Sequence, residues 1–174
     1  VNPADRIVRI ENLDNSGLTD ITVNLRGGNN TFDGRTVTQD MSINSANNDR
    51  VYGGLGDDTI KNSGGNIVIY GNQGNDDISA AGGVVYGDAG NDMIEVDGSH
   101  VYGGSGDDEI RGGSADEIFF GGSGNDRLVG GLGDDLLYGG VDDDFIFGDG
   151  LVVFNVDDNN ELLKREDGSY DFTV

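Results

Sequence analysis

Large apolar residues recur through the middle of this chain at intervals of nine or seven positions. They are Val51, Ile60, Ile69, Ile78, Val85, Ile94, Val101, Ile110, Phe119, Leu128, Leu137 and Ile146. Each is the centre of a three-residue segment, as in a short β-strand whose middle side chain is buried while its neighbours face outward. Two successive intervals add up to 18 or 16 residues, so the pattern predicts a flattened coil with two strands per turn. We therefore expect an all-β fold, a right-handed parallel β-roll or β-helix.

The segments between these apolar positions are rich in glycine and aspartate. Four stretches follow a nine-residue unit, Gly-Gly-x-Gly-x-Asp-x-U-x, in which U is the apolar position, and the stretches from Gly71 and Gly87 match it with one glycine replaced. The six stretches read GGLGDDTIK from Gly53, GNQGNDDIS from Gly71, GDAGNDMIE from Gly87, GGSGDDEIR from Gly103, GGSGNDRLV from Gly121 and GGLGDDLLY from Gly130. The first six residues of the unit predict a tight turn and the last three a short strand.

Because one coil contains two units, the turns separate onto two edges of the roll. Edge one carries turns from Gly53, Gly71, Gly87, Gly103, Gly121 and Gly139. The sixth position of every edge-one turn is an aspartate: Asp58, Asp76, Asp92, Asp108, Asp126 and Asp144. On edge two the sixth position is Asp49, then Ile67, then two shortened units, then Glu117 and Asp135. Edge one thus looks like a complete series of ligand-bearing turns, whereas edge two looks able to bind ions only near 112–150.

The formal net charge of -23 favours cations as ligands and excludes nucleic acid and anionic membranes as partners. A turn offers carbonyl oxygens and one carboxylate, whereas calcium takes six to eight oxygens, so each ion should lie between successive turns. Our candidate metal ligands are the first, third and sixth residues of these turns. They are Gly53, Leu55, Asp58, Gly71, Gln73, Asp76, Gly87, Ala89, Asp92, Gly103, Ser105, Asp108, Gly112, Ser114, Glu117, Gly121, Ser123, Asp126, Gly130, Leu132, Asp135, Val141 and Asp144.

The repeated unit resembles the RTX, or haemolysin-type calcium-binding repeat, family over roughly Asn44 to Asp149. The resemblance implies a calcium-loaded parallel β-roll in a bacterial protein that is exported by type I secretion and is extracellular. The unit from Gly112 departs from the motif at Ala115 and Glu117, and the unit from Gly139 departs from it at Asp142.

The ends of the chain lack good repeats. We expect residues 1–43 to form degenerate, metal-free β coils and an N-terminal cap, with Phe32 in the core, ahead of a calcium-binding β-roll at 44–150. Residues 151–174 read as a cap hairpin with its turn at 166–168. Alternatively, their last four residues, Asp-Phe-Thr-Val, resemble the end of a type I secretion signal.

One outer face of the roll should carry a column of aromatic rings: Tyr52, Tyr70, Tyr86, Tyr102, Phe120 and Tyr138. With Val68, Val84, Ile118 and Leu136 beside it, this column either stiffens the sheet or forms a contact surface for a neighbouring domain, a second copy or a polysaccharide.

The residues do not predict a catalytic centre. The single histidine, His100, excludes an HExxH zinc site, and there is no cysteine. We therefore expect a calcium-binding structural module that folds on binding calcium after secretion and that supports or follows another domain. The alternatives are part of a polysaccharide-active enzyme, such as an alginate epimerase or lyase, and a segment of an adhesin or surface layer.

Overall fold

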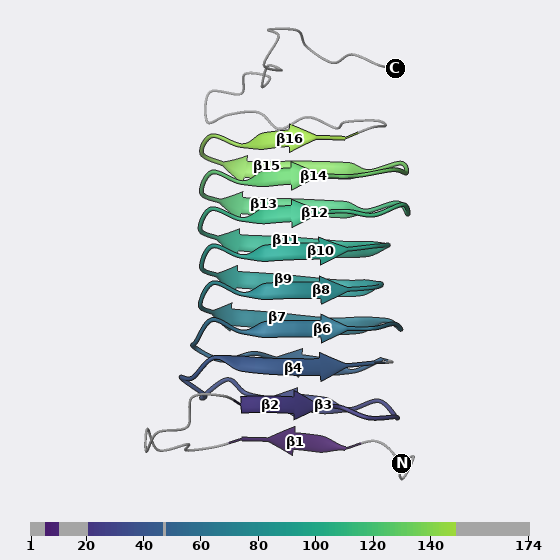
Figure 1. Cartoon of the computed structure of the whole chain (residues 1–174). Helices are drawn as coiled ribbons and strands as arrows, with labels where there is room; N and C mark the ends of the chain where they lie inside the picture. The colour runs from purple at the N-terminus through teal and green to yellow at the C-terminus, as the bar shows by residue number, and fades with distance from the viewer. Residues whose placement is uncertain (1–5, 11–20, 47, 149–174) are drawn as a thin grey trace, which may run out of the picture.

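The structure is a computed structural model that describes residues 6–10, 21–46 and 48–148. These residues form a solenoid in which the chain passes alternately between two parallel sheets of eight strands (Figure 1). Sheet A contains the odd-numbered strands, in the order β1 (Ile7–Arg9), β3 (Thr31–Asp33), β5 (Arg50–Tyr52), β7 (Ile67–Gln73), β9 (Gly83–Ala89), β11 (Ser99–Ser105), β13 (Ile118–Ser123) and β15 (Leu136–Val141). Sheet B contains the even-numbered strands, β2 (Ile21–Asn24), β4 (Met41–Ser45), β6 (Thr59–Asn62), β8 (Asp77–Ala80), β10 (Met93–Val96), β12 (Glu109–Arg111), β14 (Arg127–Val129) and β16 (Phe145–Phe147).

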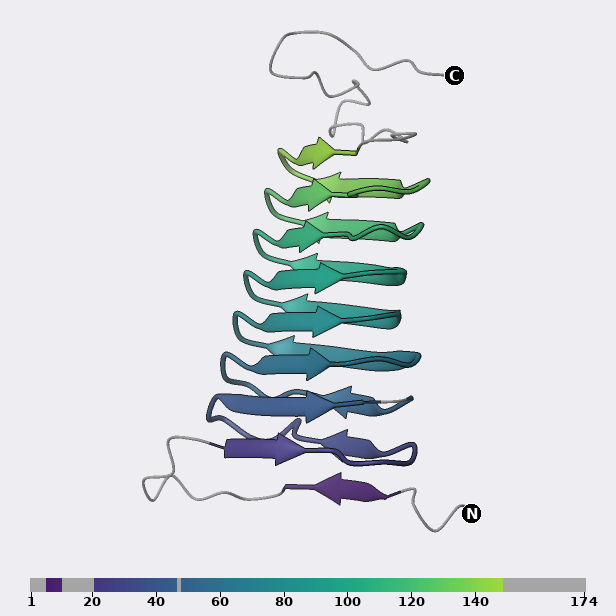
Figure 2. The same cartoon turned by 45° about the vertical axis from the view of Figure 1, so that its right-hand side comes forward.

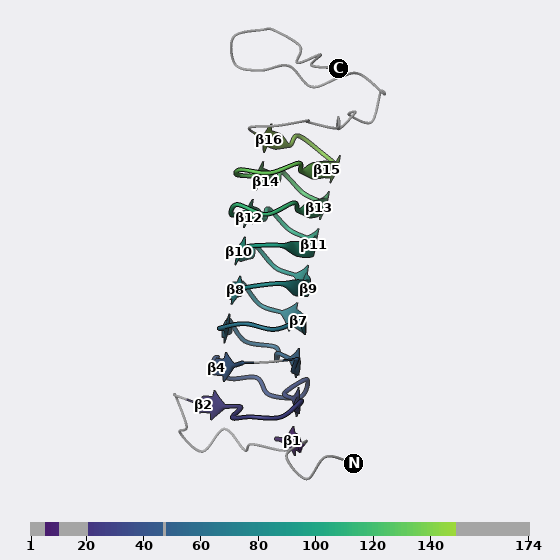
Figure 3. The same ribbon diagram turned by 90° about the vertical axis from the view of Figure 1, so that its right-hand side faces the viewer.

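The register of both sheets confirms the predicted apolar spacing. In sheet A, Val51 pairs with Ile69, and the column continues through Val85 and Val101. Sheet B carries the matching column, in which Ile60 pairs with Ile78. All of these side chains are fully buried between the sheets. The view from the side shows the two stacks of strands facing each other across this thin core (Figure 3).

The strands of sheet A are longer than the sequence pattern predicts. We expected three residues per strand, but β7, β9 and β11 have seven each. The extra pairs, such as Asn72 with Asp88 and Gln73 with Ala89, involve residues of the glycine-rich turn. Turns of equal length lie directly above one another, so their backbones continue the ladder.

The coils that precede the repeats belong to the same stack (Figure 2). Strand β2 pairs with β4, and β3 pairs with β5. Phe32 is fully buried, as predicted. No helix in the described part of the chain is long and apolar enough to cross a membrane. The predicted hairpin at 151–174 lies outside the described residues.

The predicted aromatic column lies on the outer face of sheet A. Neighbouring rings from Tyr52 to Tyr138 are stacked, with centroids 4.8 to 5.0 Å apart and planes within 9° of parallel. This spacing is the distance between adjacent strands, so the sheet itself sets the stacking. Val68 and Val84 form a second column beside the rings.

Candidate calcium-binding turns

The sixth-position aspartates connect successive coils on edge one. One oxygen of each, Oδ1, accepts a hydrogen bond from the backbone amide of the sixth residue in the preceding turn. The amide of Asp58 donates to Asp76 at 2.7 Å, that of Asp76 to Asp92 at 2.8 Å, and that of Asp92 to Asp108 at 2.9 Å. The same bond joins Asp108 to Asp126 and Asp126 to Asp144, each at 2.9 Å. Each carboxylate is therefore held in one orientation by its neighbouring coil.

The other carboxylate oxygen, Oδ2, is buried and finds no hydrogen-bond partner within the described residues in four of these turns. The four are Asp76, Asp92, Asp108 and Asp126. A buried, unpartnered carboxylate oxygen is unfavourable unless a cation or a proton satisfies it. This arrangement recurs from coil to coil, as expected for a row of ligand positions and not for an isolated packing defect.

The first-position glycines show what surrounds these oxygens. A Cβ atom on Gly87 would collide with Asp92 Oδ2 and lie 2.5 Å from the carbonyl oxygen of Gly103 in the next coil. A Cβ on Gly103 would meet Asp108 Oδ2 and the carbonyl oxygen of Gly121 in the same way. A carboxylate oxygen from one turn and a carbonyl oxygen from the next therefore converge beside each glycine. Hard oxygen donors from two adjacent coils are the donor set that calcium prefers, so these residues fit the ion.

Burial has the expected effect on the acidity of these carboxylates. It raises the pKa of Asp76 from 3.8 to about 8 and that of Asp108 to about 7. It raises the pKa of Asp58, Asp92 and Asp126 to about 6 each. In the absence of a cation, burial in the folded turns therefore shifts each of these acids toward its protonated form.

The backbone explains why the turns need glycine. The fourth-position glycines Gly74, Gly90 and Gly106 have φ angles of 113° to 136°, and a Cβ there would collide with the carbonyl of the preceding turn. The non-glycine residues with positive φ in the described ranges, Asn72, Asp88 and Asp142, each replace a motif glycine. Asparagine and aspartate tolerate this left-handed region better than other residues do. The departure at Asp142 is thus compatible with the turn.

The predicted third-position carbonyls already have one partner each. The carbonyl oxygens of Ala89, Ser105 and Ser123 accept the amides of Gly74, Gly90 and Gly106 at 3.0, 2.9 and 2.8 Å. A carbonyl oxygen has two lone pairs, so each of them can accept one further interaction.

Edge two repeats the arrangement only in its later coils. Glu117 and Asp135 each have a buried side-chain oxygen without a partner in the described structure, and the amide of Glu117 donates to Asp135 at 3.1 Å. Burial raises the pKa of Glu117 to about 7. A Cβ on Gly112 would collide with the carbonyl oxygen of Gly130 and lie 2.6 Å from Glu117 Oε2. The longer glutamate side chain thus reaches the position that aspartate occupies elsewhere.

Asp49 lies in the same column of edge two, but both of its oxygens are satisfied. Its Oδ1 accepts the amide of Asn30 at 2.6 Å, and its Oδ2 accepts the hydroxyl of Ser45 at 2.8 Å. Sequence reasoning missed Ser45, although a hydroxyl four residues before the carboxylate was the available signal.

The described residues contain no group of three or more histidine, cysteine, aspartate or glutamate side chains that could hold a metal. That agrees with one carboxylate per turn, where backbone carbonyls must supply the remaining ligands. The family model of the RTX calcium-binding nonapeptide repeat matches four segments, at 45–66, 84–100, 98–128 and 120–150. The chain belongs to this family. No curated protein and no solved structure matches it. The matched segments contain the turns that bring carboxylate and carbonyl oxygens together, except the turn from Gly71 to Asp76.

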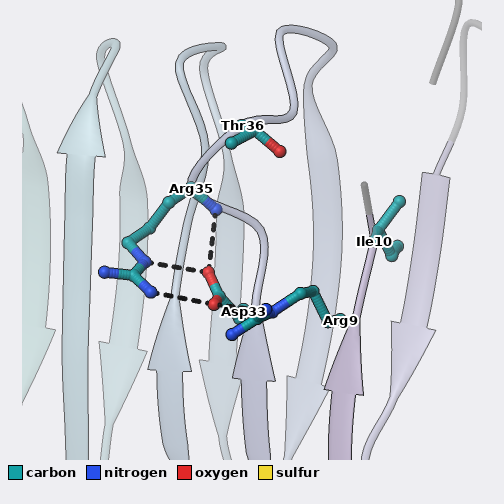
Figure 4. Close-up of a pocket in the computed structure, with 5 residues that line it drawn as sticks. All are labelled: Arg9, Ile10, Asp33, Arg35 and Thr36. Carbon is teal, nitrogen blue, oxygen red and sulfur yellow. Dashed lines mark hydrogen bonds and ion pairs between the residues drawn. The ribbon is translucent and has the colours of Figure 1, made fainter. Parts of the chain in front are cut away.

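Sequence analysis also missed a charged cluster at the N-terminal end of the aromatic column (Figure 4). Arg35 donates two hydrogen bonds of 2.9 Å to the carboxylate of Asp33, and Arg9 lies 3.2 Å from the same carboxylate. These bonds lower the pKa of Asp33 to about 2. The Arg35 guanidinium also lies 4.9 Å from the ring centroid of Tyr52 and covers the end of the stack. This carboxylate is neutralised by the chain itself.

Proposed function

We propose that this chain is a calcium-binding structural module whose turns bind calcium between successive coils. The observation that carries the proposal is the repeated buried carboxylate oxygen without a partner, placed beside a carbonyl oxygen of the next turn. On edge one, the carboxylates from Asp58 to Asp126 and the first-position carbonyls of the following turns would hold the ions. Glu117 and Asp135 would add ligands on edge two.

We further propose that binding of calcium and folding are coupled. The folded repeats bury acidic groups whose charges the described residues leave uncompensated, within a chain of net charge -23. Glycine adds to the entropic cost of ordering, by roughly 0.5–1 kcal/mol relative to alanine at each ordered position. Calcium offsets both costs because it supplies positive charge at the buried oxygens.

The coupling of folding to calcium binding also bears on the localisation of the module. RTX repeats are typical of secreted proteins, and we propose that this chain is secreted and extracellular. At the low calcium concentration of a cytosol, it would stay unfolded and could pass through a type I secretion channel. Outside the cell, where calcium is about millimolar, it would fold and support or follow another domain.

The test compares far-UV circular dichroism of the chain with and without calcium, together with a count of the ions bound at saturation. We expect a spectrum of disordered chain after chelation and a β spectrum on adding calcium, but not on adding an equal concentration of magnesium. Magnesium is the matched control because it has the same charge but demands a tighter octahedral geometry. A full β spectrum in the chelated sample would refute the coupling of folding to binding.

For the aromatic column we propose a supporting role within sheet A. Each internal ring is stacked against two neighbours at 4.8 to 5.0 Å, so its faces are already in contact. Sugar rings usually stack on aromatic faces, whereas this column presents ring edges. A neighbouring domain or a polysaccharide remains the alternative partner, and the double substitution described in the Discussion separates the two roles.

A further inference from the structure

The first edge-one turn in the described residues, Gly34 to Met41, differs from the turns that follow it on this edge. The amide of Met41 donates to Asp58 Oδ1 at 2.7 Å, and the amide of Asp57 donates to Asp40 Oδ1 at 2.9 Å. Later turns make the same bonds between their sixth positions and between their fifth positions. Met41 therefore stands at the sixth position, where every later turn of this edge has an aspartate.

This turn is also longer than the others. The amide of Leu55 donates to the carbonyl of Val37 at 2.7 Å, which places Val37 at the second position of the turn. Gly34 is the first position, so Arg35 and Thr36 are an insertion of two residues. The carbonyl of Gly34 accepts the amide of Val37 at 2.8 Å, within the same turn. This bond closes the turn on itself.

The side chain of Met41 fills the space in which the later turns hold their unpartnered oxygens. A Cβ on Gly34 would lie 2.8 Å from the terminal methyl carbon of Met41, where a Cβ on Gly71 would collide with the unpartnered Oδ2 of Asp76. The same methyl carbon would lie 3.1 Å from a Cβ on Gly54 in the next turn. Met41 is only 2 % exposed. A methyl group thus occupies the gap between the two turns.

Edge two shows the same replacement at another coil. Ile67 lies in the column that also contains Glu117 and Asp135, and its side chain is fully buried. The coil with Ile67 at this position therefore buries an apolar side chain there, whereas the next two coils have Gly83 and Ser99 in the same column. An apolar replacement is one of the ways in which the roll fills a position that lacks its carboxylate.

We propose that Met41 ends the calcium ladder by occupying a cation position. The inference rests on the proposed calcium-binding function and deepens it, because it specifies where on edge one the binding of ions begins. The first turn closes without metal, through the Met41 side chain and the Gly34–Val37 bond. The first calcium is then held by the carbonyl of Gly71 and by Asp58, whose Oδ2 also accepts the amide of Gly54 at 2.6 Å.

The direct test converts Met41 into the residue that the repeat requires. Met41→Asp should bind one calcium more than the parent chain, measured by equilibrium dialysis with metal analysis. Met41→Leu should bind the same number as the parent. Met93→Asp is the matched control, because it adds a carboxylate at an exposed position on sheet B, outside any turn. If folded Met41→Asp and Met93→Asp bind equal numbers of ions, the inference is wrong.

The reverse exchange tests the inference even if Met41→Asp does not fold. Asp92→Met and Asp92→Ala should lose the same number of calcium ions, but Asp92→Met should unfold at a higher temperature because its side chain fills the vacated space. Equal unfolding temperatures would overturn the inference. A parent chain that binds no calcium would instead refute the proposed function, so the two failures are distinguishable.

Discussion

The two edges of the roll are built from similar glycine-rich turns, yet they treat their carboxylates differently. On edge one, four successive aspartates from Asp76 to Asp126 have a buried oxygen without a partner in the described structure. On edge two, only Glu117 and Asp135 do so among the described residues, while Asp49 is fully satisfied by Asn30 and Ser45. An aspartate at the sixth position is therefore not sufficient to leave an unpartnered oxygen. The difference is whether another group of the chain, such as the Ser45 hydroxyl beside Asp49 or the Gly54 amide beside Asp58, has taken the second oxygen.

Because the two edges differ, removing a carboxylate should lower the number of bound calcium ions more on edge one than on edge two. This is the largest effect that we expect. Asp108→Ala should lower the calcium count by about two, because Asp108 supplies Oδ2 to its own turn and holds the amide of Asp92 in the preceding one. Asp49→Ala should leave the count unchanged. Isothermal titration calorimetry of the two variants checks this, and equal losses would show that the edges are equivalent.

A methyl group placed inside a turn should act almost as strongly as the loss of its carboxylate. Gly103→Ala brings a Cβ against Asp108 Oδ2 and the carbonyl oxygen of Gly121, so calcium binding at that turn should weaken at least tenfold. Ser105→Ala is the control from the same turn, since its predicted contribution comes from the backbone carbonyl alone. A Gly103→Ala chain with the parent's affinity would exclude this position from the site.

The pH dependence sharpens the comparison between neutralised and unneutralised carboxylates. Well below pH 3.8, Asp76 and Asp108 are protonated in both the folded and the unfolded chain and do not affect stability. Their folded pKa values are raised to about 8 and about 7, so they destabilise the folded chain increasingly as the pH rises from 3.8 to these values. The calcium-free chain should therefore contain more β-structure at pH 5 than at pH 8, and calcium should bind more weakly at pH 5.

Asp33 shows the opposite dependence, which makes it an internal reference. Its pKa is lowered to about 2, so the stability that it contributes is present above its ordinary value of 3.8 and is lost as the pH falls through 2. The Arg35–Asp33 cluster should therefore stay intact at pH 5. Circular dichroism of the chain, stripped of calcium on a chelating resin, checks the pH dependence predicted for Asp76 and Asp108. More β-structure at pH 8 than at pH 5 would contradict that prediction.

Substitutions on the outer face of sheet A should have the smallest effect, and this effect should be on stability. Replacing Tyr86 and Val84 by serine removes half-buried apolar surface, so the calcium-loaded chain should lose roughly 1–3 kcal/mol of stability. Its calcium count should not change, because neither side chain faces a turn. Thermal unfolding and calcium titration measure the two quantities. Altered self-association or altered binding to a polysaccharide, without a loss of stability, would favour the contact-surface role instead.

Much of the fold follows from spacing alone. The intervals of nine and seven residues predicted which apolar residues lie in which sheet, and the strand registers confirm this from Val51 to Ile146. They also predicted the aromatic column, which the ring stacking confirms from Tyr52 to Tyr138. Prediction succeeds here because each coil contacts only the next one, so a regular repeat along the chain becomes a regular column in space.

The sequence by itself determined the two-sheet roll, its buried columns and the two edges on which acidic turns gather. Only the tertiary structure decided which acids keep an unpartnered oxygen. Ser45 satisfies Asp49, and Arg35 neutralises Asp33 from within an insertion that the repeat pattern does not contain. Met41 reaches the sixth position through a turn of eight residues, so counting along the repeat does not find it. The physical reason is that periodicity fixes the path of the backbone, whereas the state of a carboxylate depends on particular side chains that cross from adjacent coils or loop out of register.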